Sequence, residues 1–253
     1  MALLNGKHAL VTGGGTGVGA AIALILAAEG AKVTISGRRA EPLEGVASKS
    51  ENIAAVIADV TDGASVRSMF EQAKVKNGLV DIVIANAGAA ESAPFGKVDE
   101  GHWDRMIGVN LTGVFHTLQT ALVDMQKQGW GRLISIASTA GLKGYSYVAP
   151  YCAAKHGVVG LTKALALEVA KTGVTVNAVC PGFVDTPLLD KSVQTIVKKT
   201  GRSTEEARQI LASDNPQGRL IQPEEVAATT LWLCSDAASS INGQAISISG
   251  GEI

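Results

Sequence analysis

Two side chains that can exchange protons stand four residues apart in the stretch YCAAK at positions 151–155. Pro150 precedes them and the following residues favour helix, so the sequence predicts a helix with Tyr151 and Lys155 on one face. A tyrosine hydroxyl ordinarily has a pKa of about 10, and a neighbouring ammonium favours the phenolate. We therefore expect Lys155 to lower the pKa of Tyr151 toward neutral pH, where the hydroxyl could act as acid and base.

A glycine-rich turn near the start of the chain lies between an apolar strand and an apolar helix. The strand is expected at 7–12, the helix at 20–29 and a second strand at 31–36, which makes a β-α-β unit. Glycines let such a turn approach a pyrophosphate, which the helix N-terminus attracts. A plain glycine turn is the alternative, because the first glycine gap is longer than in the commoner dinucleotide fingerprint. The turn consists of Thr12, Gly13, Gly14, Gly15, Thr16, Gly17, Val18 and Gly19.

The elements that must position these residues alternate along the whole chain. Further strands are expected at 52–59, 79–85, 131–138, 174–180 and 244–249, and helices at 61–76, 99–127, 150–171, 187–213 and 223–235. This alternation predicts a doubly wound α/β fold, with a parallel sheet of about seven strands and helices on both faces. No linker-like shift in composition divides the chain, so we expect a single domain over residues 1–253. Its segment at about 187–217 is expected to cover the substrate pocket as a lid.

Composition and charge narrow the classes of function. The 253 residues are 46% hydrophobic with a net charge of −1, so no basic surface for nucleic acid is indicated. Three cysteines without metal-binding spacing favour free thiols in a reducing compartment, and no metal site is expected. The chain start runs straight into a strand without a signal peptide, and the glycine-broken stretch 13–28 is too short to cross a membrane. The expected location is cytoplasmic.

Taken together, the motifs resemble those of the short-chain dehydrogenase/reductase family, in its single-domain branch. The resemblance covers essentially the whole chain. It implies a Rossmann-like fold and an enzyme that interconverts a ketone and a secondary alcohol. One departure is Ala85, where the family more often has an asparagine. The resemblance rests on TGGGTGVG at 12–19, ANAG at 85–88, Asn110, Ser138, Tyr151 with Lys155, and Pro181-Gly182 with Thr186.

The resemblance implies a role for each catalytic residue. Tyr151 would exchange a proton with the substrate hydroxyl, and Lys155 would lower its pKa and hold the nicotinamide ribose. Ser138, at the end of a strand, would hydrogen-bond the substrate oxygen, and Asn110 would anchor a water that links Lys155 to solvent. Without the resemblance, Ser138 would be a turn residue and Asn110 a polar group satisfied within its helix.

A nicotinamide dinucleotide is the cofactor that the resemblance implies. Gly37 stands where an aspartate would bind the ribose 2′-OH of NAD. Arg38 and Arg39 are suited to the phosphate of NADP, so NADP is favoured and NAD remains open. Besides these arginines, the expected cofactor contacts are Thr12, Gly13, Gly15, Thr16, Gly17, Val18 and Gly19 of the turn, and Asp59, Val60, Asn86, Ala87, Gly88, Tyr151, Lys155, Pro181, Gly182, Val184 and Thr186.

The sequence indicates the substrate less clearly than it indicates the cofactor. Stretches such as APYCAAKHGVVGLTKALALE are similar to 3-oxoacyl-thioester and polyketide ketoreductases, so NADPH-dependent reduction of such a thioester or a related ketone is the leading hypothesis. Basic residues of the lid could attract a phosphorylated or thioester-carried substrate, or form a solvated helix face. The candidate pocket residues are Ser138, Tyr145, Tyr147, Tyr151, Phe183 and Leu188, several of which would give an aromatic wall.

Two alternatives stay open at this point. One is an NAD-dependent dehydrogenase of secondary alcohols, including aryl alcohols, which an aromatic pocket would favour. The other is a non-catalytic dinucleotide-binding sensor or scaffold, whose signature would be the loss of a residue of the catalytic set. The expected partner is a small ketone or alcohol, with no nucleic acid and no membrane, and the resemblance implies a homotetramer.

Overall fold

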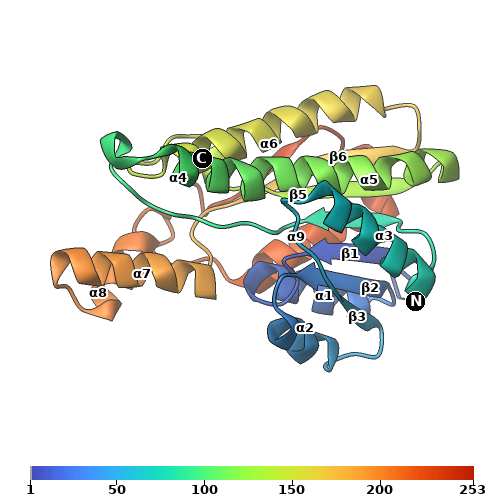
Figure 1. Cartoon of the computed structure of the whole chain (residues 1–253), viewed down its shortest axis with the longest axis horizontal. Helices are drawn as coiled ribbons and strands as arrows, with labels where there is room; N and C mark the ends of the chain where they lie inside the picture. The colour runs from blue at the N-terminus through green and yellow to red at the C-terminus, as the bar shows by residue number, and fades with distance from the viewer. Residues whose placement is uncertain (1) are drawn as a thin grey trace.

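The computed structural model describes residues 2–253, whose strands form one seven-stranded sheet (Figure 1). The strands are β1 (His8–Thr12), β2 (Lys32–Gly37), β3 (Ile53–Ile57), β4 (Ile82–Ala85), β5 (Gly131–Ile136), β6 (Val174–Pro181) and β7 (Ala245–Ile248). They lie in the order β3-β2-β1-β4-β5-β6-β7, and every neighbouring pair is parallel. The predicted fold class and number of strands are confirmed.

The strands are composed mostly of apolar residues because both faces of the sheet are covered. Every residue of β1, β4, β5 and β6 is buried. The chain winds outward from β1 through β2 to β3, then returns to place β4 on the other side of β1. Such a reversal opens a crevice at the carboxyl ends of the strands, where ligands bind in open α/β sheets. The topology therefore places the candidate site at the ends of β1, β4 and β5.

Helices cover each face and give it a separate apolar core (Figure 1). One core lies under α1, α2 and α9, and the other under α3, α5 and α6. The short helix α2, which contains a proline and a glycine, is not among the predicted elements. The helices are α1 (Gly17–Ala28), α2 (Ala40–Ala47), α3 (Gly63–Asn77), α4 (Glu100–Ile107), α5 (Gly113–Gln128), α6 (Ala149–Glu168), α7 (Pro187–Thr200), α8 (Thr204–Ala212) and α9 (Pro223–Cys234).

Two predicted helices are each divided in the structure. The helix expected at 99–127 is α4 and α5, which are joined by the π-helical turn Gly108–Thr112. The helix expected at 187–213 is α7 and α8, which are separated at Gly201 with a left-handed φ of 71°. The pair α7 and α8 projects from the body of the molecule (Figure 1) and has a small apolar core of its own.

The run Glu100–Gln128 is long and apolar enough to cross a membrane, judged by length and composition alone. In the structure its longer part, α5, packs against β4 and β5. Val114, Leu118 and Met125 of this helix are buried there. Packing on the sheet therefore accounts for the buried apolar residues of this run, whereas Trp103, Phe115 and Val123 are exposed. The absence of a membrane partner stays a prediction.

Candidate active site

Three of the predicted catalytic residues converge where β5 ends and α6 begins. The Ser138 hydroxyl accepts a hydrogen bond from the backbone N–H of Ala140 at 3.1 Å, which fixes it at the start of a short 3-10 turn. The ammonium of Lys155 donates to the carbonyl of Ile136 at 2.8 Å. The same Nζ lies 5.7 Å from the ring centroid of Tyr151. The strand end and the first turns of the helix thus bring a hydroxyl, a phenol and an ammonium together.

Close packing of the 3-10 turn on α6 depends on a glycine. A Cβ added to Gly141 would lie 2.7 Å from the carbonyl oxygen of Lys155 and 3.2 Å from the Val159 side chain. Any larger residue would therefore push the turn away from the helix. Gly141 sets the spacing between Ser138 on the turn and Lys155 on the helix.

Burial controls the protonation of the tyrosine and the lysine in the ligand-free protein. It raises the pKa of Tyr151 to about 12, although the side chain of Ser138 opposes the rise. It lowers the pKa of Lys155, which is 4% exposed, to about 8. In this ligand-free state the pKa of Tyr151 is therefore raised, and its lowering by Lys155 stays a prediction. The phenolate loses more by leaving water than it gains from an ammonium that is already bound to the Ile136 carbonyl.

Asn110 lies in the π turn between α4 and α5, with its side chain fully buried. Its amide donates to the carbonyls of Ala89 at 2.8 Å and Met106 at 3.0 Å, and its Oδ1 accepts from the Ala89 N–H at 3.2 Å. A Cβ on Gly88 would lie 2.9 Å from that Oδ1. Asn110 therefore holds the loop that follows β4, and its link to Lys155 through a water stays a prediction.

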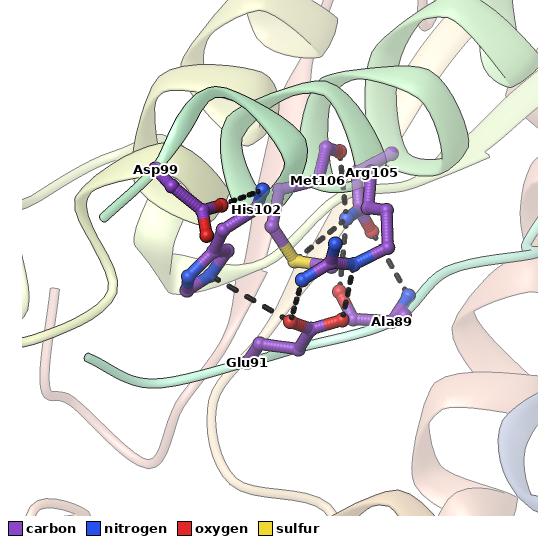
Figure 2. A network of polar contacts seen from close by, with 7 residues as sticks. Ala89, Glu91, Asp99, His102, Arg105 and Met106 are labelled. Atoms are coloured by element: carbon purple, nitrogen blue, oxygen red, sulfur yellow. Dashed lines mark hydrogen bonds and ion pairs between the residues drawn. The ribbon is translucent and has the colours of Figure 1, made fainter. Parts of the chain in front are cut away.

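The same loop is tied to α4 by an ion pair that sequence reasoning missed (Figure 2). The carboxylate of Glu91 accepts from Arg105 at 3.0 and 3.3 Å, and it lies 3.9 Å from Nε2 of His102. The hydrogen bond from Arg105 holds the pKa of Glu91 below its usual range. Asp99 caps the helix through the N–H of His102 at 2.7 Å. Nothing local in the sequence signals a contact between residues 14 positions apart.

The glycine turn after β1 forms a cradle in which the backbone passes close to neighbouring segments. Gly13 and Gly17 have left-handed φ values of 66° and 52°. A Cβ on Gly19 would overlap the carbonyl of Gly13 and the amide of Asn86. Within residues 2–253 no side chain caps the first turn of α1, so its N–H groups stay available to a phosphate. These features fit a nicotinamide dinucleotide.

Asn86 joins the ends of β1 and β4 under this cradle. Its amide donates to the carbonyls of Thr12 at 2.9 Å and Gly13 at 3.2 Å. The Thr12 hydroxyl accepts from the N–H groups of Asn86 at 3.0 Å and Ala87 at 3.1 Å. On the far side, a Cβ on Gly17 would lie 3.0 Å from the Thr186 side chain. Residues from three distant stretches of the chain therefore meet around this cradle.

The region after β2 is where the cofactor's adenosine end would lie. Arg38 and Arg39 are exposed there, and the turn is joined to β2 by the hydrogen bond from the Gly14 N–H to the Ser36 carbonyl at 3.1 Å. Burial raises the pKa of the Asp59 carboxyl, but hydrogen bonds from Thr61 and the charge of Arg38 outweigh this and leave the pKa below its usual range. Because Asp59 accepts from its own turn, its contact with adenine stays a prediction.

The predicted substrate residues divide into two groups. The rings of Tyr145 and Phe183 pack edge to face, with centroids 6.1 Å apart. Tyr147 is 65% exposed and has a left-handed φ of 69°, which is unusual for a bulky residue. Its carbonyl accepts from the N–H of Ala93 at 2.8 Å. Leu188, on α7, is also largely exposed. Tyr145 and Phe183 thus form an aromatic pair, while Tyr147 and Leu188 lie at the surface.

An arginine holds the proposed lid against the exit of β6. Arg208 of α8 donates to Asp185 at 2.5 Å and to Asp190 at 3.2 Å. The first aspartate follows β6 and the second lies in the first turn of α7. This contact, like those of Lys143 and Glu252 beside Tyr145, joins segments whose pairing the sequence does not indicate.

Comparisons with known proteins agree with this geometry. A family model described as short chain dehydrogenase matches residues 7–196. The D-beta-hydroxybutyrate dehydrogenase of Cupriavidus necator is 40% identical over 256 residues, which cover 98% of this chain and 98% of that protein. The 3-oxoacyl-acyl-carrier-protein reductase of Thermotoga maritima is 36% identical and covers 98% of each. A crystal structure of a variant actinorhodin polyketide ketoreductase with NADPH matches with a TM-score of 0.95, at 36% identity, over 100% of this chain and 99% of that one.

Proposed function

The chain belongs to the short-chain dehydrogenase family of oxidoreductases, and we propose that it uses NADPH to reduce the ketone of a 3-oxoacyl thioester or a related ketone. The observation that carries the proposal is the convergence of Tyr151, Lys155 and Ser138 beside the glycine cradle. Similarity to a 3-oxoacyl reductase and a polyketide ketoreductase supports the substrate class. The product is a secondary alcohol.

The proton is supplied by the protein. Ser138 and Tyr151 hold the ketone oxygen through their hydroxyl groups, and Tyr151 gives its proton to that oxygen as it becomes an alkoxide. The bound nicotinamide supplies the hydride that the carbonyl carbon accepts. A tyrosine pKa of about 12 keeps the phenol protonated at neutral pH, which suits reduction. Lys155, whose pKa is about 8, is largely charged at pH 7 and stabilises the phenolate that remains.

The preference for NADPH rests on the arginines after β2. Gly37 leaves no carboxylate to bind a ribose 2′-OH, and Arg38 and Arg39 offer planar donors for a phosphate. The variant Arg38→Asp is expected to lose the preference for NADPH over NADH. An unchanged ratio of kcat/KM for the two coenzymes would overturn this assignment.

The substrate class is tested by initial rates of NADPH and NADH oxidation with acetoacetyl-CoA and with an aryl methyl ketone. Fast, NADPH-selective turnover of the thioester is expected. Tyr151→Phe is expected to lose most of this turnover while it still binds NADPH, measured by fluorescence titration. Near-normal turnover of this variant would contradict the catalytic assignment.

A second candidate is an NAD-dependent dehydrogenase of secondary alcohols, including aryl alcohols. The edge-to-face pair of Tyr145 and Phe183 favours it, because an aromatic wall suits an aromatic or apolar substrate. Turnover of only the aryl ketone in the same assay, with NADH preferred, would select this function.

We also propose that the chain is a single catalytic domain, with 187–217 as its lid, and that it assembles as a homotetramer in the cytoplasm. Free Cys152, Cys180 and Cys234 suit a reducing compartment. Exposed apolar side chains on α5, α6 and α9, such as Phe115, Leu167 and Trp232, supply surface for assembly. Light scattering of the purified protein tests the tetramer, and a monomeric mass would contradict it.

A further inference from the structure

We propose that Glu252 is a specificity-determining residue that makes the substrate pocket reject carboxylates, so that the enzyme reduces neutral 3-oxo esters and thioesters rather than free 3-oxo acids. The inference rests on the proposed function and deepens it. It is carried by the position of the Glu252 side chain, by the groups that bind it and by the charge that these groups leave uncompensated.

The tail after β7 folds back toward the site through two glycines. Gly250 and Gly251 have left-handed φ values of 63° and 97°. A Cβ on Gly250 would overlap the side chain of Asn215, so only glycine allows this approach. The turn leaves the Glu252 side chain 5% exposed, and a Cβ on Gly182 would lie 3.2 Å from its Oε2. The carboxylate therefore lies at the exit of β6, where the substrate would be held.

A chain of hydrogen bonds connects this carboxylate to the loop that begins at Ser138. The Tyr145 hydroxyl donates to Oε1 of Glu252 at 2.5 Å, so it must accept from the Thr139 hydroxyl, 2.7 Å away. Burial raises the pKa of the Tyr145 phenol most, and Glu252 raises it further, so the hydroxyl stays protonated. The hydroxyl of Tyr145 is thus committed to Glu252, and its ring is what remains for substrate.

The charges of the cluster do not cancel. Glu252 is paired with Lys143 at 2.6 Å, and the lysine side chain is 40% exposed. Water screens the lysine more than it screens the buried carboxylate. Asp214 adds a second acidic group: burial raises its pKa, Glu252 raises it further and Lys143 lowers it, so it lies within electrostatic reach of both. The cluster therefore holds two acidic groups, Glu252 and Asp214, against the single basic group of Lys143.

A free 3-oxo acid brings a carboxylate close to this charge. Its carboxylate is separated from the reacting ketone by one methylene, and the ketone oxygen is held by Ser138, which is adjacent to Thr139. Thr139 in turn contacts Tyr145, the partner of Glu252. The acidic groups of the cluster oppose the binding of a substrate carboxylate on this side of the site. An ester or thioester at the same position is neutral and meets no such repulsion.

The test compares acetoacetate with ethyl acetoacetate, using NADPH, in the wild-type enzyme and in Glu252→Gln. The wild type is expected to prefer the ester by at least about tenfold in kcat/KM. Glu252→Gln keeps an acceptor for Tyr145 and removes the charge, so it is expected to raise kcat/KM for acetoacetate about tenfold and to change the ester by less than about threefold. Lys143→Met removes the basic partner of Glu252 and is expected to shift the ratio the opposite way.

Glu168→Gln is the matched control, because this exposed acid lies at the other end of α6 and its loss should leave the ratio unchanged. An unchanged ratio in Glu252→Gln and Lys143→Met, or equal use of both substrates by the wild type, would overturn the inference alone. A wild-type enzyme that reduces no ketone with either coenzyme would overturn the proposed function and the inference with it.

Discussion

Replacing Lys155 with methionine should stabilise the cofactor-free protein at pH 7 while it abolishes activity. Burial lowers the pKa of this lysine from 10.5 to about 8. A shift of about 2.5 units corresponds to about 3 kcal/mol of unfavourable free energy for the buried ammonium. The variant also loses the hydrogen bond to the Ile136 carbonyl, which costs about 1–2 kcal/mol. The expected net gain in the free energy of unfolding is about 1–2 kcal/mol.

The free energy of unfolding should depend on pH in a direction that follows from the pKa of Lys155 in the folded and unfolded states. The folded-state pKa of Lys155, about 8, lies below the unfolded value of 10.5. Between these two pH values the unfolded chain binds more protons than the folded chain, so wild-type stability should rise with pH. Lys155→Met lacks this contribution, so its advantage should shrink above pH 8 and reverse at about pH 9.

The assay is urea unfolding of both proteins without cofactor, followed by tryptophan fluorescence at pH 7 and at pH 9.5. The protomer concentration must be equal throughout, because assembly contributes to apparent stability. Lys163→Met, at an exposed lysine on the same helix, should change stability by less than about 0.5 kcal/mol. The reasoning is refuted if Lys155→Met is the less stable protein at pH 7, or if its advantage is the same at both pH values.

Three further predictions concern the pH profile, the strained tyrosine and the lid. The rate of ketone reduction should fall as the pH rises through about 8, where Lys155 loses its proton, and a pH–kcat/KM profile flat to pH 9.5 would contradict this role. Tyr147→Gly should stabilise the protein by about 0.5–1 kcal/mol in urea unfolding, because glycine adopts its left-handed φ without strain; a destabilised variant would show the backbone to be relaxed. Arg208→Met should raise KM about threefold and leave kcat nearly unchanged, because the two half-exposed ion pairs that hold α8 to Asp185 and Asp190 are each worth less than about 1 kcal/mol. An unchanged KM in steady-state assays would show that this contact does not contribute to substrate binding.

The alternation of elements could be read from the sequence because it depends on local patterns. Apolar runs bounded by glycine and proline gave the seven strands in the right order along the chain, and the pair at 151 and 155 falls on one face of α6 as its spacing requires. The breaks within the two long predicted helices were missed because local patterns do not reveal contacts with distant segments. The π turn around Asn110 follows from its hydrogen bonds to Ala89, a residue in another segment, and no local signal marks it.

The sequence by itself determined the fold class, the glycine turn and the placement of Tyr151 and Lys155 on one helix, since each depends on residues near one another in the chain. Only the tertiary structure decided the protonation of that pair, because the pKa of Tyr151 depends on how much water the fold removes from it. The structure alone also joined Glu252 to Tyr145, 107 residues away, because a buried carboxylate finds its partners through the path of the folded chain. Burial and long-range contact are properties of the assembled sheet and its helices, and no stretch of sequence contains them.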